Sequence, residues 1–193
     1  MPINPSGVNL PEDMRPEISK TNCLGLTVFL LLVTTTPSAA QEQVAKLEVF
    51  GGYAFIRADS SEGRVNLNGW TASPETHLNR TIALAADFDG AYGRVLGERI
   101  SVHSAMLGPK FTARNKRLKP FAHALFGVVR EAEAGDVQYG FGMTFGGGVD
   151  YDLNRRMSFR LAQTDYEYTR VNLLTHHNYR FAAGVVLKFG ELK

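Results

Sequence analysis

The last strand-like segment of the chain alternates between two kinds of side chain, and its sequence is YRFAAGVVLKF. One face is apolar with aromatic residues at both tips: Tyr179, Phe181, Ala183, Val185, Leu187 and Phe189. The other face is small or charged: Arg180, Ala182, Gly184, Val186 and Lys188. This alternation is typical of a strand with lipid on one side and a narrow polar lumen on the other.

The same pattern recurs along the chain, and no long segment after residue 41 has a helical period. The alternation predicts eight strands, near residues 45–58, 67–76, 82–92, 101–113, 120–130, 138–151, 157–168 and 179–189. We therefore expect an all-β fold, an eight-stranded antiparallel up-and-down transmembrane β-barrel. Eight is also the strand number at which side chains just fill the lumen.

The connections between these strands are of two kinds. Short basic turns are expected at 77–80, 114–117 and 153–156, and two of them contain the tripeptide LNR. Longer, more varied loops are expected at 59–66, 93–100, 131–137 and 169–178. Short turns on one rim and long variable loops on the other are typical of outer-membrane barrels.

The seventh segment loses its phase after Leu161. Asp165 and Glu167 would share the outward parity of Leu161 if the strand were regular. A β-bulge near Gln163–Thr164 would turn both acids inward and send Tyr166 and Tyr168 out.

The N-terminus is predicted to be a cleaved signal peptide, residues 1–40, followed by the barrel domain, residues 41–193. Arg15 and Lys20 precede an apolar run at 24–33, and small residues lead to Ala40. The run is too short to cross a bilayer as a helix, and a membrane anchor or a buried helix is the alternative. Either Met1 or Met14 could be the start.

Charge and cysteine content exclude several kinds of partner and site. The 193-residue chain has a net charge of +2, so no nucleic-acid partner is expected. Its only cysteine, Cys23, precedes the apolar run, which excludes an intrachain disulfide and CxxC motifs.

Several segments resemble the small bacterial outer-membrane barrels of the OmpA-like and OmpX-like superfamily: VFGGYAF, NGWTAS, ADFDGAYG, GPKF, PFAHALFG, FGGGVDYDL, RLAQTDY and AAGVVLKFG. The resemblance covers about residues 46–190. It implies a location in the bacterial outer membrane, with outer-membrane lipids and the barrel-assembly machinery as partners. It does not specify an activity. The aromatic residue expected at the terminus is offset here, because Phe189 is followed by GELK.

Inward parity predicts a lumen charge network made of Glu48, Asp87, Asp89, Lys110, His123, Asp150, Arg160, Arg180 and Lys188. These charges should pair, because an unpaired charge in a confined interior is costly. Closure of the barrel would bring Glu48 near Arg180 or Lys188, and consecutive strands would bring Asp87 near Lys110. The alternative is an acid–base site of carboxylates and a histidine. Membrane-interface positions are predicted for Tyr53, Trp70, Tyr92, Tyr139, Tyr151, Tyr179 and Phe189.

The sequence therefore predicts a non-enzymatic structural or surface-interaction protein, without cofactor or metal, and with any extracellular ligand bound by its long loops. One alternative is an outer-leaflet lipid-modifying hydrolase, but no HxS pair is present. A second is a soluble lipocalin-like periplasmic barrel, which would need an apolar lumen. His176 and His177 are adjacent, so in a strand they point to opposite faces and chelate a metal poorly.

Overall fold

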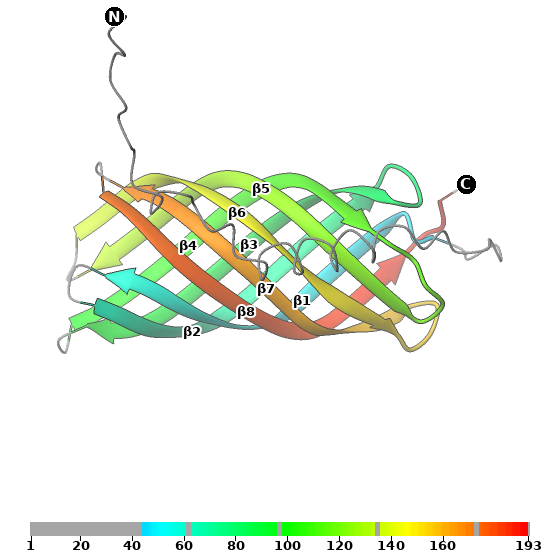
Figure 1. Ribbon diagram of the computed structural model, residues 1–193, viewed down its shortest axis with the longest axis horizontal. Coiled ribbons are helices and arrows are strands. Elements are labelled where there is room, and N and C mark those ends of the chain that lie inside the picture. Colours follow the sequence, from blue (N-terminus) through cyan, green and yellow to red (C-terminus); the bar gives the residue numbers. More distant parts are fainter. Residues whose placement is uncertain (1–43, 61–62, 96–97, 134–135, 172–173, 193) are drawn as a thin grey trace, which may run out of the picture. The chain divides into compact units, whose positions relative to one another are not determined.

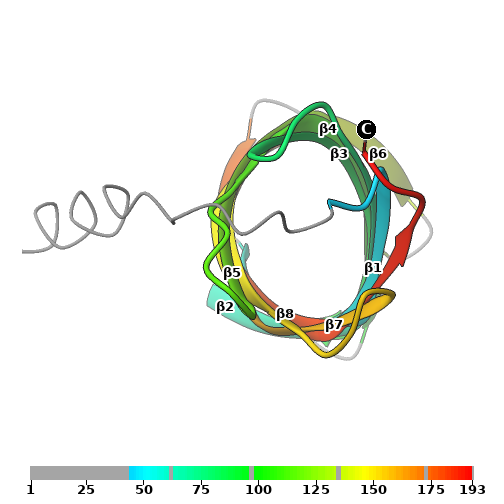
Figure 2. The ribbon, with the colours of Figure 1, turned by 90° about the vertical axis from the view of Figure 1, so that its right-hand side faces the viewer.

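The computed structural model describes residues 44–60, 63–95, 98–133, 136–171 and 174–192, so the predicted signal peptide lies outside the described residues. The strands are β1 Leu47–Ser60, β2 Gly63–His77, β3 Ile82–Val95, β4 Glu98–Thr112, β5 Leu118–Glu133, β6 Asp136–Asp152, β7 Met157–Val171 and β8 Leu174–Phe189. Each strand pairs antiparallel with the next, and β1 pairs with β8 to close the barrel (Figure 1, Figure 2). The predicted eight-stranded up-and-down barrel is confirmed. Within the described residues, no helix is long and apolar enough to cross a membrane.

Side chains alternate between the lumen and the outer wall along every strand. On β8, Phe181 is 45% exposed on the outer wall, whereas Arg180 is 1% exposed and faces the lumen. On β6, glycines make room for side chains from neighbouring strands. A Cβ on Gly146 would lie 1.9 Å from Asp165 Oδ1, and one on Gly148 would lie 2.8 Å from the ring of Phe121. The narrow lumen thus requires these positions to lack side chains.

The predicted bulge in β7 is present, but it lies just before the expected position. The register with both neighbours shifts between Arg160 and Gln163, and Leu161 and Ala162 are both exposed. Two consecutive outward residues reverse the parity of the rest of the strand. Asp165 and Glu167 therefore face the lumen, at 0% and 6% exposure.

Asparagine side chains shape the two LNR turns in the same way. Asn79 Oδ1 accepts hydrogen bonds from the backbone N–H groups of Thr81 and Ile82, and Asn154 Oδ1 accepts one from Arg156 N–H. In both turns, the Leu and Asn N–H groups donate to one carbonyl oxygen, that of Ile82 or Met157. These Asx turns explain why the tripeptide recurs at this end, which we call the turn end.

The prediction of four long loops at the opposite end, the loop end, is wrong. Within 59–66, 93–100, 131–137 and 169–178, the described residues continue as strand, and paired strands come within two residues of each other at 60/63, 95/98, 133/136 and 171/174. The polar composition of these segments suggested loops. Ladder hydrogen bonds, however, are made by the backbone and do not require an apolar face.

The lumen also contains apolar layers. Ile56, Leu67 and Ala91 form one cluster toward the loop end, and Ile56 lies directly across the β1–β8 ladder from Arg180. A second cluster contains Ala85, Met106, Leu125 and Val129, and Val102 packs against both clusters. The charged groups are thus bounded by apolar side chains toward the loop end.

Candidate functional site: the charged lumen

The middle of the lumen holds one arginine among four carboxylates, the central cluster: Arg180, Asp87, Asp89, Asp165 and Glu167. The guanidinium lies 2.5 Å from Asp87, 2.8 Å from Asp89, 2.9 Å from Asp165 and 3.2 Å from Glu167. The carboxylates come from β3 and β7 and the arginine from β8, so Arg180 connects opposite parts of the wall. Every side chain in the cluster is at most 8% exposed.

Further side chains donate hydrogen bonds to three of the four carboxylates of the central cluster. Asp87 accepts hydrogen bonds from the hydroxyls of Thr71 and Ser73, and Asp89 accepts one from Ser104. His123 Nε2 lies 2.9 Å from Asp165 Oδ1, and the Gln163 amide donates to Asp165 Oδ2 at 2.7 Å. These bonds compensate for part of the desolvation of buried carboxylates.

A second group of charges lies nearer the turns, and we call it the turn-end cluster: Glu48, Glu75, Lys110, Lys119, Asp150, Asp152, Arg160 and Lys188. Lys110 Nζ lies 2.7 Å from Glu75 Oε2 and 3.8 Å from Asp150. Arg160 pairs with Asp150 at 2.8 Å, and both Lys119 and Lys188 pair with Asp152. Four cations thus face four carboxylates.

Aromatic rings support the cations of this cluster. The Arg160 guanidinium lies 4.0 Å from the ring centroid of Phe50 and 4.3 Å from that of Phe121. Lys110 Nζ lies 4.2 Å from the Phe121 centroid. Such contacts are favourable where water is excluded, and both phenylalanines are buried.

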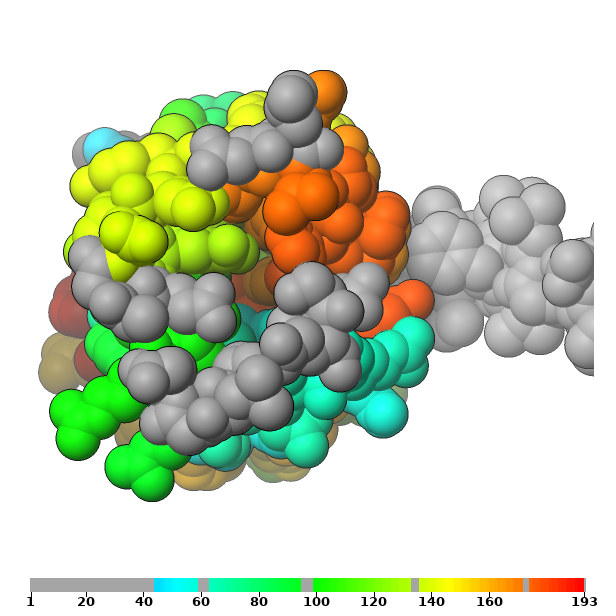
Figure 3. Space-filling view, turned by 90° about the vertical axis from the view of Figure 1, so that its left-hand side faces the viewer, coloured from blue at the N-terminus to red at the C-terminus, as the bar shows by residue number. Residues whose placement is uncertain are grey.

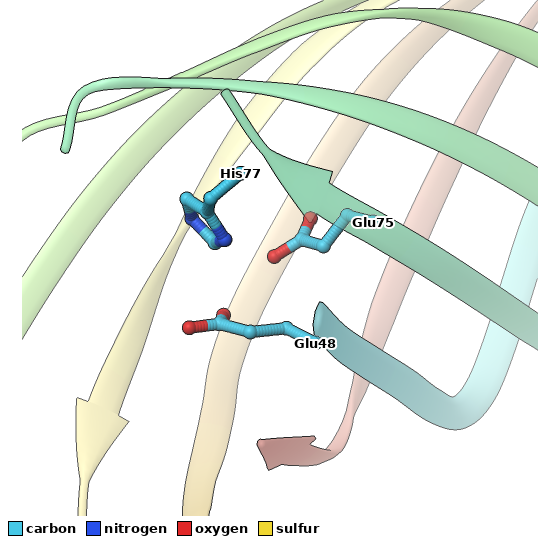
Figure 4. Close-up of side chains that lie close together, drawn as sticks. All are labelled: Glu48, Glu75 and His77. Carbon is cyan, nitrogen blue, oxygen red and sulfur yellow. The ribbon is translucent and has the colours of Figure 1, made fainter. Parts of the chain in front are cut away.

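Glu48, Glu75 and His77 have ligand atoms within 4.8 Å of one another, at the ends of β1 and β2 (Figure 4). Two carboxylates and an imidazole are a donor set that could hold a divalent cation. Lys110, however, already donates to both oxygens of Glu75, and Arg114 donates to His77 Nε2 at 3.0 Å. The positive charge at this position is supplied by the chain itself, so we interpret the group as part of the ion-pair cluster.

The structure brings most of the predicted lumen charges together, but one predicted pair is wrong. Asp87 does not reach Lys110, because the β3–β4 register places Asp87 opposite Met106 and Lys110 opposite Ala83. A separation of four residues along a strand is about 13 Å. Lys110 instead reaches Glu75 past Ala83 and Ala85 of β3, whose short side chains leave the space open.

The other expected neighbours lie as follows. Glu48 lies opposite Lys188 in the β1–β8 register, although the Lys188 ammonium forms its ion pair with Asp152. Arg160 pairs with Asp150, and Arg180 pairs with Asp87 and Asp89.

Sequence reasoning missed several lumen residues, and Glu75 is the most important of them. It shares the parity of Thr71 and Ser73 on β2, so extending that face by one position would have identified it. Lys119 and Asp152 were missed because they lie at strand ends.

The aromatic residues predicted for the membrane interface all lie on the outer wall. Six are 43% to 69% exposed, namely Tyr53, Trp70, Tyr92, Tyr139, Tyr179 and Phe189, and Tyr151 is partly buried. Tyr53 donates a hydrogen bond to Asn68, and Tyr92 contacts His103. His177 is outward as well, stacked on Tyr166, while His176 has the opposite parity.

Comparisons with known proteins agree with this geometry. The family model described as outer membrane protein beta-barrel domain matches residues 26–189. Among solved structures, Neisserial surface protein A is 19% identical with a TM-score of 0.64, and the match covers 77% of this chain and 100% of that one. Ail, the attachment invasion locus protein of Yersinia pestis, is 15% identical with a TM-score of 0.51, covering 74% of this chain and 99% of the other. A search of curated proteins gives no significant match.

Proposed function

We propose that this chain, which belongs to the family with an outer membrane protein beta-barrel domain, is a non-enzymatic barrel that acts through its outer surface while its lumen stays closed. Family membership implies the bacterial outer membrane. The observation that carries the proposal is the central cluster, in which one guanidinium holds carboxylates from opposite walls of the lumen. A lumen crossed by ion pairs and flanked by apolar side chains supports a structural role rather than transport.

The alternatives have less support. A lipocalin-like carrier needs an apolar interior, whereas the middle of this lumen is charged. A lipid-modifying hydrolase needs a nucleophile beside a base on the outer wall. Among the described residues, the hydrogen bonds of His103 and His177 go to tyrosines rather than to a serine.

A surface-interaction role also agrees with the name of one structural neighbour. The Yersinia pestis protein Ail is described as an attachment invasion locus protein, and it has also been solved with the heparin analogue sucrose octasulfate. At 14% to 15% identity this likeness shows the fold alone.

Recordings in planar lipid bilayers test the closed lumen. The refolded wild-type protein should give no stepwise ion conductance, because ion pairs cross its lumen. Stepwise conductance by the wild type that changes in Arg180→Met would overturn the closed-lumen proposal. Incubation with phospholipid vesicles, followed by chromatography of the lipids, should give no hydrolysis product, and a new lysolipid would favour the enzyme.

A further inference from the structure

The central cluster of the lumen carries more negative than positive charge. Its four carboxylates contact the single guanidinium of Arg180, and His123 contacts one of them, Asp165. Even with His123 protonated, these groups carry two more negative charges than positive ones. The turn-end cluster has no such surplus, because four cations face four carboxylates there. Surplus charge in a confined interior is costly unless a further cation balances it.

Two oxygen atoms on the loop-end side of the central cluster have no hydrogen-bond partner among the described residues, namely Glu167 Oε1 and Thr169 Oγ1. Glu167 and Thr169 are 6% and 3% exposed, and they follow each other on the inward face of β7. Glu167 Oε1 lies 3.2 Å from Arg180 Nε, but this contact does not have the geometry of a hydrogen bond. Buried oxygens without a partner are costly, and one bound cation would satisfy both.

The lumen wall between these two oxygens and the loop end is polar along β7 and β8. Asn178 lies opposite Glu167 in the β7–β8 ladder, and His176 lies opposite Thr169. All four residues have the inward parity. Figure 3 looks onto the loop end and shows a hollow at its centre, bordered by yellow β6, orange β7 and β8, and cyan β2. A small ion can therefore approach Glu167 from this end along polar side chains.

We propose that Glu167 and Thr169 bind a calcium ion on the loop-end side of Arg180. Carboxylate and hydroxyl oxygens are ligands of hard cations, and calcium accepts irregular geometry and completes its shell with water. Asp89 contacts Arg180 from β3, on the wall opposite β7, so the ion has negative charge on two sides. The ion leaves the ion pairs of Arg180 in place, so the site is compatible with a closed lumen.

Equilibrium dialysis against calcium chloride tests the site on the refolded full chain. Zwitterionic micelles and a constant ionic strength, set with sodium chloride, limit binding by the detergent and by surface charge. The test variants are Glu167→Gln, which removes the charged ligand, and Thr169→Val, which removes only the hydroxyl. The matched control is Glu191→Gln, which removes one exposed carboxylate at the turn end. A heat-modifiable gel shift shows that each variant is folded.

We expect the wild type to bind one calcium ion per chain. Glu167→Gln should bind calcium at least ~10-fold more weakly, because affinity falls with the number of charged ligands. Thr169→Val should lose less affinity, and Glu191→Gln should bind like the wild type. In urea unfolding followed by the fluorescence of Trp70, calcium should raise the midpoint of the wild type and not that of Glu167→Gln.

Three results would overturn the proposal. An absence of binding by the wild type would mean that protons balance the surplus charge of the central cluster. Equal binding by Glu167→Gln would place the ion elsewhere on the chain. An equal loss of affinity in Glu191→Gln would indicate general charge attraction rather than a site in the lumen.

Discussion

The central cluster and the turn-end cluster both pair carboxylates with basic side chains, but they distribute positive charge differently. In the central cluster, Arg180 alone faces Asp87, Asp89, Asp165 and Glu167. In the turn-end cluster, four cations on separate strands face four carboxylates. One side chain thus balances the carboxylates at the centre of the barrel, whereas several side chains balance those at the turn end.

The two clusters also differ in what they connect. Arg180 is 93 residues from Asp87 and 15 residues from Asp165 in the sequence, so one guanidinium holds β3 against β7 and β8. At the turn end, Arg160 and Asp150 lie opposite each other on neighbouring strands. Loss of Arg180 should therefore loosen the barrel across its width, while loss of a turn-end cation should act locally.

The largest effect is expected for Arg180→Met, which keeps the length of the side chain and removes its charge. Four buried carboxylates would lose their common partner, so the free energy of unfolding should fall by about 3–5 kcal/mol. Urea unfolding in lipid vesicles, followed by the fluorescence of Trp70, the only tryptophan, measures this. The control is Lys188→Met, because Asp152 keeps Lys119 as a partner. Equal losses in the two variants would remove the distinction between the clusters.

A smaller loss is expected for Lys110→Met. Glu75 would lose both of its hydrogen bonds from the ammonium group, which costs about 1–3 kcal/mol for a buried acceptor. The same urea titration checks it. A loss of unfolding free energy as large as that of Arg180→Met would show that the other cations of the turn-end cluster do not compensate for the loss of Lys110.

Double-mutant cycles measure which charged residues interact with one another. Asp87→Ala and Lys110→Ala should be additive to within about 0.3–0.5 kcal/mol, because the register separates the two residues. Glu75→Ala and Lys110→Ala should instead couple by about 0.5–3 kcal/mol. Coupling between Asp87 and Lys110 that exceeds the Glu75 value would mean that the β3–β4 register is wrong.

The smallest effect is expected for Glu167→Gln. Arg180 keeps three other carboxylates, and Glu167 Oε1 has no hydrogen bond despite its 3.2 Å approach to the guanidinium. Removing this fourth negative charge should change the free energy of unfolding by less than about 1 kcal/mol, in either direction. A loss above that would show that Arg180 needs all four acids.

The fold was predictable because lipid imposes a strict period of two on each strand, as in the YRFAAGVVLKF segment. The membrane imposes no such period beyond the apolar band. The alternation therefore fades near Arg94 and Arg130, and the strand ends there were mistaken for loops. Backbone pairing continues regardless of side-chain polarity, and only the structure reveals it.

The lumen charges were predictable as a set, since parity identifies which residues point inward. Their pairing was not, because it depends on the stagger between strands and on side-chain length. Lys110 reaches Glu75 over the small Ala83 and Ala85, rather than the acid on the adjacent strand. The bulge at Leu161–Ala162 was likewise predicted without its exact position, because a break in the alternation of inward and outward residues indicates one extra residue but does not locate it.

The dependence of the central cluster on Arg180 is tested most directly by measuring the cost of Arg180→Met in two backgrounds. One is the wild type, and the other carries Asp87→Asn, Asp89→Asn and Glu167→Gln. If Arg180 holds the barrel by balancing these carboxylates, its replacement should cost about 3–5 kcal/mol in the wild type and clearly less once they are neutral. An equal cost in both backgrounds would contradict the account, because Arg180 would then act through packing rather than charge.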